Sequence, residues 1–226
     1  MSGLAISVID TAVTDFYEKG SPITIETKDL YLRSVQESDL GFFQNLYTDP
    51  VTMRLFADNE KRLENLGEEA WKAEQMKSAA GRVATFVKRW TVDRIPFSGF
   101  VIIKKDNLLP IGFIVAGFGE NPGQLESATV ITSTEQSKGY GTQARYALMH
   151  KYLPALIENH YRIYGFPLTA DGAPVTELVA TTRLDNIASD RVMRKNGMEK
   201  VGENQNKYGQ ERGVYRFAYV NPPVKV

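Results

Sequence analysis

The stretch that decides the fold reads STEQSKGYGT and occupies residues 133–142. An apolar run of strand length precedes it and a segment with helical spacing follows it, so Gly139 and Gly141 lie where a strand turns into a helix. The first N–H groups of a helix have no partner within the helix and the helix dipole is positive there, so such a turn can bind a phosphate group. Glycine suits this turn because a side chain would obstruct the phosphate.

Two other phosphate-binding motifs do not fit this turn. It lacks the Gly-Lys-Ser/Thr sequence of a Walker P-loop and the third glycine of a Rossmann fingerprint. A glycine-containing turn that binds no ligand is the plain alternative, because such turns are common. Features elsewhere in the sequence are needed to distinguish a phosphate site from a turn that binds no ligand.

Apolar periodicity on both sides of the turn predicts a mixed α/β fold. Apolar runs separated by turn residues predict an antiparallel meander over residues 97–133. Asp49-Pro50 is a helix start signal, and the spacing of Ser34 and Glu37 fits a capping box. We expect strands at residues 30–33, 97–104, 111–118, 125–133, 177–181 and 212–219, and helices at residues 37–47, 67–93, 139–157 and 186–196.

Length and spacing predict a single domain. A chain of 226 residues can bury one sizeable core. Residues 1–24 show no clear period, so we expect an N-terminal extension there and one domain over residues 25–226. Within it, residues 160–175 are rich in tyrosine, glycine and proline, which indicates an inserted loop.

The composition argues against several classes of partner and site. The 27 Lys and Arg residues balance the 27 Asp and Glu residues, so no excess of basic side chains favours nucleic acid or a membrane surface. The chain has no Cys and only two His residues, so we expect no metal site. The first residues lack the features of a secretory signal, and the longest apolar run, residues 111–118, is far shorter than the ~20 residues that span a bilayer. We therefore expect a cytoplasmic protein.

Residues 136–141, QSKGYG, resemble the acetyl-CoA signature of the GNAT N-acetyltransferase superfamily, Arg/Gln-x-x-Gly-x-Gly/Ala. Within the longer stretch, residues 133–141 resemble the histone-acetylating branch of that superfamily. Near the end of the chain, NIAS at residues 186–189 and KNGM at residues 195–198 resemble its downstream motif, Asn-x-x-Ser/Ala followed by Lys-x-Gly-Phe.

The beginning of the chain resembles one branch of this family. Leu32-Arg33, the SDL at residues 38–40 and the YTDPVTM at residues 47–53 resemble the opening of the enzymes that acetylate ribosomal-protein N-termini and related amines. The whole resemblance covers residues 28–220.

The resemblance implies a fold and a cofactor site. A mixed, largely antiparallel central sheet, flanked by helices, would splay apart between its fourth and fifth strands, at residues 125–133 and 176–181. The pantetheine of acetyl-CoA would lie between these strands and pair with their exposed backbone. The residues implied to contact acetyl-CoA are Ile131, Thr132, Ser133, Gln136, Ser137, Lys138, Gly139, Tyr140, Gly141, Thr142 and Asn186.

The implied activity is transfer of an acetyl group from acetyl-CoA to a primary amine, by direct attack in a ternary complex. A protein N-terminus, a lysine and a small-molecule amine all remain open as acceptors, because acceptor contacts come from variable loops. A non-catalytic CoA-binding module of the same fold is the alternative. The aromatic loop at residues 160–175 is expected to help choose the amine. Its alternatives are a surface excursion and an oligomer contact, such as that of a homodimer.

Amide formation needs a base for the amine, a donor to the tetrahedral oxyanion and a proton for the leaving thiolate. Glu126 is the best-placed carboxylate for the base, and a structural ion pair is its alternative role. In the histone branch the corresponding glutamate lies one position earlier, at Leu125, so Glu126 would point to the other face unless a bulge intervenes. A backbone N–H near Ile131 or Thr132 would donate a hydrogen bond to the oxyanion.

The acid is harder to assign. Many family members use a tyrosine whose position is Met193 here, and methionine cannot donate a proton. Ser189 resembles the serine that replaces this tyrosine in the ribosomal-protein branch, and it lies one turn after Asn186, whose plain role is to cap the helix. Tyr208 and Tyr215 are alternative donors that the sequence does not rank.

Overall fold

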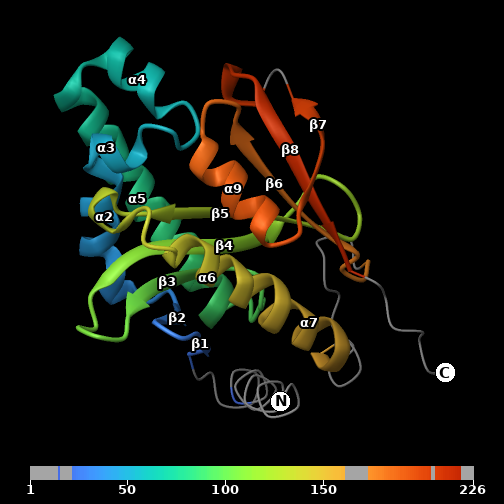
Figure 1. The fold of residues 1–226 in the computed structure, drawn as a ribbon. Coiled ribbons are helices and arrows are strands. Elements are labelled where there is room, and N and C mark those ends of the chain that lie inside the picture. The colour runs from blue at the N-terminus through green and yellow to red at the C-terminus, as the bar shows by residue number, and fades with distance from the viewer. Residues whose placement is uncertain (1–14, 16–21, 161–172, 205–206, 220–226) are drawn as a thin grey trace.

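The described residues form one sheet of eight strands (Figure 1). The computed structural model describes residues 15, 22–160, 173–204 and 207–219. The strands lie in the order β1-β2-β3-β4-β5-β6-β8-β7, and every neighbouring pair is antiparallel except β5 with β6, so the predicted mixed, largely antiparallel sheet is confirmed. The strands are β1 (Thr24–Glu26), β2 (Leu30–Ser34), β3 (Gly99–Lys104), β4 (Pro110–Phe118), β5 (Gln124–Ile131), β6 (Glu177–Arg183), β7 (Glu199–Asn204) and β8 (Arg212–Ala218).

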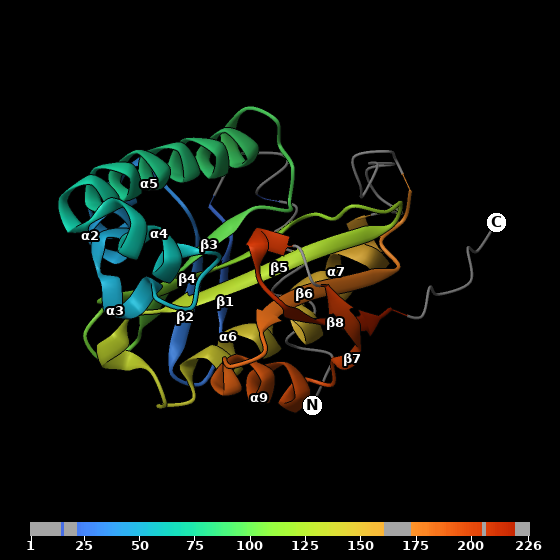
Figure 2. The same cartoon turned by 90° about the horizontal axis from the view of Figure 1, so that it is seen from above.

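Helices cover both faces of this sheet, as Figure 2 shows. Each face has its own hydrophobic core, so the sheet is the middle of three layers. One face carries α2 (Leu40–Thr48), α3 (Pro50–Met53), α4 (Asn59–Leu66) and α5 (Glu68–Thr91), and the other carries α6 (Tyr140–Ala147), α7 (Leu153–Ala155) and α9 (Ile187–Lys195).

The long helix α5 buries one side, as its sequence predicts. Val83, Phe86 and Trp90 are all buried, and so is Trp71 near the start of the helix. The indole N–H of Trp90 donates to the Gly99 carbonyl at 2.9 Å. The periodic apolar residues therefore hold α5 on the sheet, and one of them also ties the end of the helix to β3.

The helix start predicted at Asp49-Pro50 is confirmed. Asp49 is the N-cap of α3, and its Oδ1 accepts from the Val51 N–H at 3.0 Å. Pro50 occupies the first turn, where its missing N–H costs nothing. The cap fixes the position of α3 beside the end of β5.

The capping box predicted at Ser34 and Glu37 is wrong. Ser34 is the last residue of β2 and pairs with β3, so its backbone belongs to the sheet. The carboxylate of Asp39 instead accepts from the Gln36 N–H at 2.7 Å and forms an ion pair with Arg33. The N-cap is therefore Gln36, two residues after Ser34, and the helical turn begins at Glu37, where the helix was expected.

Several other boundaries differ from the sequence predictions. The sequence patterns miss β1, α4 and β7, which are short or have little apolar periodicity. β1 crosses the expected end of the N-terminal extension, and Ile23 before it is already buried. The helix expected at residues 139–157 starts as α6 and then widens into π-helical turns around Pro154, which has no N–H to donate.

Some of the sequence predictions fall on residues that the structure does not describe. Residues 161–172, most of the expected loop, lie outside the described residues, as do most of residues 1–21. In the described part of the chain, no helix is both long enough and apolar enough to cross a membrane.

The feature that positions the site is the short pairing of β5 with β6. These two parallel strands share three residue pairs, the last of which joins Glu126 to Val179. Beyond that pair, β5 continues to Ile131 and β6 to Arg183, each with an antiparallel partner only on its far side. The two strands therefore splay apart, as the family resemblance implied.

Phe113 of β4 offers a test of the packing on the α2–α5 face. We expect Phe113→Ala to lower the free energy of unfolding by about 3–5 kcal/mol, because the lost ring leaves a cavity. Val51→Ala, at a side chain that is 67% exposed, is the control and should change it by less than ~0.5 kcal/mol. Equal effects in denaturant unfolding would contradict this packing. The buried Phe113 ring lies 5.4–6.4 Å from the rings of Phe43, Tyr47, Phe56 and Phe86.

Candidate active site

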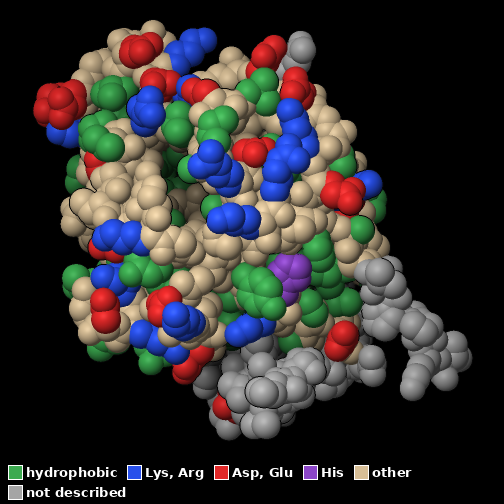
Figure 3. All heavy atoms as spheres, viewed as in Figure 1, with side chains coloured by type: hydrophobic (Ala, Val, Ile, Leu, Met, Phe, Trp, Pro, Cys, Tyr) green, Lys and Arg blue, Asp and Glu red, His purple; other side chains and the backbone are tan. Residues whose placement is uncertain are grey.

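The opening between β5 and β6 forms a cleft that five parts of the chain line. Figure 3 shows it as a hollow between the α3–α4 region and α9, with basic side chains on the α9 side. The cleft brings together Glu126 and Ser189, the candidate base and the candidate acid, which lie far apart in the sequence. Its lining residues are Leu55, Phe56, Ala57, Glu126, Ser127, Ala128, Thr129, Arg145, Thr181, Thr182, Asn186, Ser189, Met193, Tyr208 and Arg212.

The backbone of β5 presents hydrogen-bonding groups to this cleft. The Thr132 N–H donates to the Ile111 carbonyl of β4 at 2.8 Å. Because backbone groups alternate between the two edges of a strand, the N–H and C=O groups of Thr129 and Ile131 face the β6 side. Thr132 therefore has its N–H committed to β4, whereas the Ile131 N–H points toward the cleft.

The glycine turn at the end of β5 presents unpaired amides. Gly139 has φ +84°, in the left-handed region that favours glycine, and no atom lies within 4 Å of where a side chain would begin. It is the N-cap of α6, so the N–H groups of the first helical residues have no partner within the helix. Among the described residues, no backbone carbonyl accepts from the N–H groups of residues 137–139 either. The turn therefore presents a cluster of unpaired N–H donors to the open space at Gly139.

The remaining glycine of the signature has a different role. A side chain at Gly141 would meet Ile131 and Val192 at 3.8–3.9 Å, which is ordinary contact. Gly141 therefore lies where the first turn of α6 approaches both β5 and α9. Tyr140 and Thr142 on either side of it are half-buried in the same turn.

Side chains of the signature hold the turn to its neighbours. The amide of Gln136 donates to the Ile131 carbonyl at 2.9 Å. The Ser133 N–H donates to Thr52 Oγ1 at 2.8 Å, and the Ser133 hydroxyl donates to Asp49 Oδ2 at 3.2 Å. Gln136 and Ser133 therefore brace the turn against β5 and α3.

The charges beside the turn are mixed. Lys138 is half-exposed and pairs with Glu135 at 3.1 Å. Lys104 lies 3.8 Å from the same carboxylate, and its ammonium stands over the Tyr140 ring. Two basic side chains therefore stand near the unpaired amides, with one carboxylate between them.

Glu126 reaches the cleft without a bulge. The β4–β5 register runs unbroken through Glu126, so its side chain points to the face opposite to that of the buried Leu125. That face carries α2 to α5, and the loop before α4 lines the cleft beside Glu126. The positive charge of Arg212 also lies close enough to interact with this carboxylate. The face reversal expected from the sequence thus brings Glu126 to the α2–α5 side of the cleft.

The start of α9 places three cleft residues on one side of a helix. Asn186 is the N-cap, and its Oδ1 accepts from the Ser189 N–H at 3.0 Å. Ser189 is half-buried, and Met193, one turn later, is buried. The plain capping role of Asn186 is therefore present, and the cap also fixes where the Ser189 side chain stands.

The structure separates the two candidate tyrosines. The Tyr215 hydroxyl donates to the Asp190 carboxylate and does not line the cleft. Burial, together with this hydrogen bond, raises the pKa of Tyr215 to about 12. Tyr208 lines the cleft, is half-exposed, and stacks its ring on the Arg212 guanidinium at 5.3 Å. Tyr208 is therefore the tyrosine that competes with Ser189.

Sequence reasoning missed Arg145, Thr129 and Arg212. Residues 141, 144, 145 and 148 share one side of α6, and all except Arg145 are small or apolar. A charged residue within an otherwise apolar stripe was the signal that could have found Arg145. Arg212 and Thr129 carry no comparable signal, because alternating polar residues are ordinary in strands.

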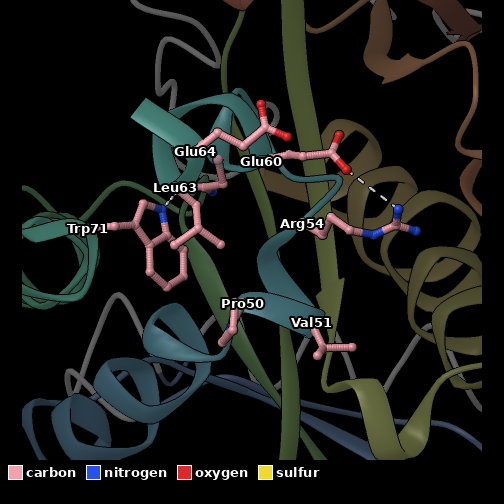
Figure 4. A pocket seen from close by; sticks show the side chains of 8 residues that line it. Pro50, Val51, Arg54, Glu60, Leu63, Glu64 and Trp71 are labelled. Carbon is pink, nitrogen blue, oxygen red and sulfur yellow. Dashed lines mark hydrogen bonds and ion pairs between the residues drawn. The ribbon is translucent and has the colours of Figure 1, made fainter. Parts of the chain in front are cut away.

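A second hollow lies beside the cleft, between α3, α4 and α5 (Figure 4). Its volume is about 450 Å³, and Trp71, Leu63 and Pro50 give it a largely apolar wall. Glu60 at its rim pairs with Arg54 of α3 and, at 2.7 Å, with Arg183 of β6. This ion pair links α4 to β6, whose Thr181 and Thr182 line the cleft. The sequence did not predict it because it depends on α4.

Comparisons with known proteins agree with this geometry. No curated protein matches the chain in sequence. Among solved structures, RimL, a ribosomal L7/L12 alpha-N-protein acetyltransferase in complex with coenzyme A, is 18% identical over 87% of this chain and 98% of that chain, with a TM-score of 0.56. RimJ of Mycobacterium smegmatis in complex with CoA-disulfide is 14% identical over 86% and 84%, with a TM-score of 0.58.

A third neighbour is the Microcin C7 self immunity acetyltransferase MccE in complex with acetyl-CoA and AMP, which is 13% identical over 85% of this chain and 94% of that chain, with a TM-score of 0.55. At these identities the likeness shows the fold. The sequence carries the family itself, because the model of the acetyltransferase (GNAT) domain matches residues 29–199. The chain therefore belongs to the GNAT acetyltransferase family.

Proposed function

We propose that this protein transfers the acetyl group of acetyl-CoA to a primary amine. The observation that carries the proposal is the junction of two features, the open backbone edge of β5 and the unpaired amides at residues 137–142. An extended chain with an anionic end, such as pantetheine ending in a pyrophosphate, suits this combination of donors. In the proposal, Ile131 and the signature residues hold the cofactor, while Ser133 and Gln136 brace the turn.

The two sides of the cleft receive the two substrates. Acetyl-CoA lies along the α6 and α9 side, because the unpaired amides are there. The amine enters from the α2–α5 side, where Glu126 stands beside the loop before α4 and the apolar hollow adjoins. RimL, which has a similar fold, is a ribosomal L7/L12 alpha-N-protein acetyltransferase, and this supports a protein N-terminus as one acceptor. Lysine and small-molecule amines remain acceptors in the proposal.

Each chemical requirement has a residue in this arrangement. Glu126 accepts the proton of the amine, directly or through water, and the amine nitrogen then attacks the thioester carbon. The Ile131 N–H donates to the oxyanion. The C–S bond breaks as the amide forms, and Ser189 donates a hydrogen bond or a proton to the departing sulfur. The rival proposal, a non-catalytic CoA-binding module, predicts that no free thiol forms with any amine.

The phosphate site can be tested at Gly139. Asn and Asp both tolerate the left-handed backbone found there, so they differ mainly in charge. We expect Gly139→Asp to weaken acetyl-CoA binding by roughly tenfold or more relative to Gly139→Asn, because its carboxylate would face the pyrophosphate. Calorimetry measures both affinities. Equal affinities would place the pyrophosphate elsewhere.

The acid can be tested by three hydroxyl deletions. Ser189→Ala should lower kcat by roughly 10- to 1000-fold and leave acetyl-CoA affinity nearly unchanged, because the hydroxyl acts mainly in the transition state. Tyr215→Phe is the control, since its hydroxyl is engaged by Asp190. Should Tyr208→Phe remove the activity while Ser189→Ala keeps it, Tyr208 is the donor.

The base can be tested through pH. An amine with a pKa near that of lysine is mostly protonated at pH 7 and much less so at pH 9, so the need for a base falls as pH rises. We expect Glu126→Gln to lower kcat/KM more at pH 7 than at pH 9. Steady-state kinetics at both pH values measure this difference. An equal loss of kcat/KM at pH 7 and pH 9 would assign Glu126 to a structural ion pair.

A further inference from the structure

Arg145 is a buried cation that pairs with no carboxylate in the described part of the chain. Only 2% of the residue is exposed, and its Nε has no hydrogen-bond partner. Its other nitrogens donate to Thr129 Oγ1 at 3.1 Å and, weakly, to the sulfur of Met198 at 3.7 Å. Among the described residues, no Asp or Glu forms an ion pair with it. A charge placed in this way destabilises a fold, so its presence calls for a function.

Burial disfavours the charged form and lowers the pKa of Arg145 to about 10. The guanidinium therefore still carries its proton at neutral pH, and its positive charge acts in surroundings that screen it weakly. The other charged or titratable residues of the cleft are Glu126, Tyr208 and Arg212. Tyr219 faces Arg145 from beyond β8, and burial raises the pKa of its hydroxyl, which keeps it neutral.

Thr129 connects this charge to the cleft. Its hydroxyl accepts from Arg145, so the hydroxyl hydrogen must point away from the guanidinium. Thr129 lines the cleft on β5, on the same strand edge as Ile131. The hydroxyl hydrogen is therefore free to be donated to a group within the cleft. Met193, across the cleft on α9, has no hydrogen to donate.

We propose that Arg145 is a positioning residue that orients the Thr129 hydroxyl and, with its charge, stabilises the thiolate form of CoA as it leaves. The inference rests on the proposed function, which supplies the thiolate when the C–S bond breaks. Arg145 lines the cleft, but only 2% of the residue is exposed, so it acts through Thr129 and through its field. A fixed donor and charge of this kind need no rearrangement when negative charge develops on the sulfur.

The pH dependence of CoA binding tests this proposal without any turnover. A thiol has an ordinary pKa near 8.5, and a site that prefers the thiolate lowers it, so affinity for free CoA should rise between pH 7 and pH 9 by roughly fivefold relative to acetyl-CoA. Acetyl-CoA has no free thiol, so it reports the effect of every protein group that titrates in this range. Calorimetry of both ligands at both pH values gives the ratio.

Three substitutions assign the effect to Arg145 and Thr129. Arg145→Met should abolish the relative gain for CoA while leaving the melting temperature equal or higher, because it removes a buried unpaired charge. Thr129→Val should reduce the gain, and Thr129→Ser, which keeps the hydroxyl, should preserve it. A gain that survives in both Arg145→Met and Thr129→Val overturns the proposal. So does a lowered melting temperature of Arg145→Met with the gain intact.

Failure of the proposed function looks different. If the wild-type protein binds neither CoA nor acetyl-CoA, the whole assignment of the cleft is wrong. If it binds both with the same pH dependence, only the role of Arg145 and Thr129 is wrong.

Discussion

The early end of the pairing between β5 and β6 is the constraint on which the rest of the site depends. Each strand has one complete antiparallel partner, and the two share only three residue pairs with each other. The unpaired edges would cost free energy in a closed sheet, because buried backbone groups need partners. Here they border a cleft, so a ligand backbone can satisfy them. The opening is therefore the place where the proposed function puts the ligand.

The neighbours of the opening hold it in shape. The signature turn is attached to the end of β5 through Gln136 and to α3 through Ser133. On the other side, Arg212 donates to Thr181 twice, at 3.2 Å each, which ties β8 to β6. The ion pair of Glu60 with Arg183 spans from α4 to β6 above the cleft. Each of these contacts looks purely structural by itself. Together they hold β5 and β6 apart at a fixed distance.

The cleft also holds residues that a stable fold alone would not favour. Arg145 and Arg212 are buried, and each keeps a nitrogen without a hydrogen-bond partner. Ala57, which lines the cleft, has φ +51°, a left-handed conformation that costs a residue with a Cβ about 1–3 kcal/mol. Such costs collect at functional sites, where a preorganised environment is worth more than stability.

Local signals in the chain are enough to identify the family, the glycine turn before α6 and most of the elements. Gly139, Gly141 and the N-cap signals are local, because a turn that needs a left-handed residue or a helix that needs a cap shows this within a few positions. The meander, α5 and α9 follow from apolar periods long enough to be read without a structure. The elements β1, α4 and β7 escaped because their residues pack against distant parts of the chain and have little period of their own.

Which side chains share the cleft follows from long-range packing and cannot be read from the sequence. Glu126, Ser189 and Tyr208 come from three separate elements, and their meeting depends on where two strands stop pairing. Tyr208 and Tyr215 look alike in sequence, yet one lines the cleft and the other is bound to Asp190. Arg145 shows the same limit. A charge in an apolar stripe marks an anomaly, and only the packing reveals that no Asp or Glu of the described segments pairs with it. Contacts between residues far apart in the sequence produce no periodic pattern, so the side chains that meet in the cleft can be identified only from the folded structure.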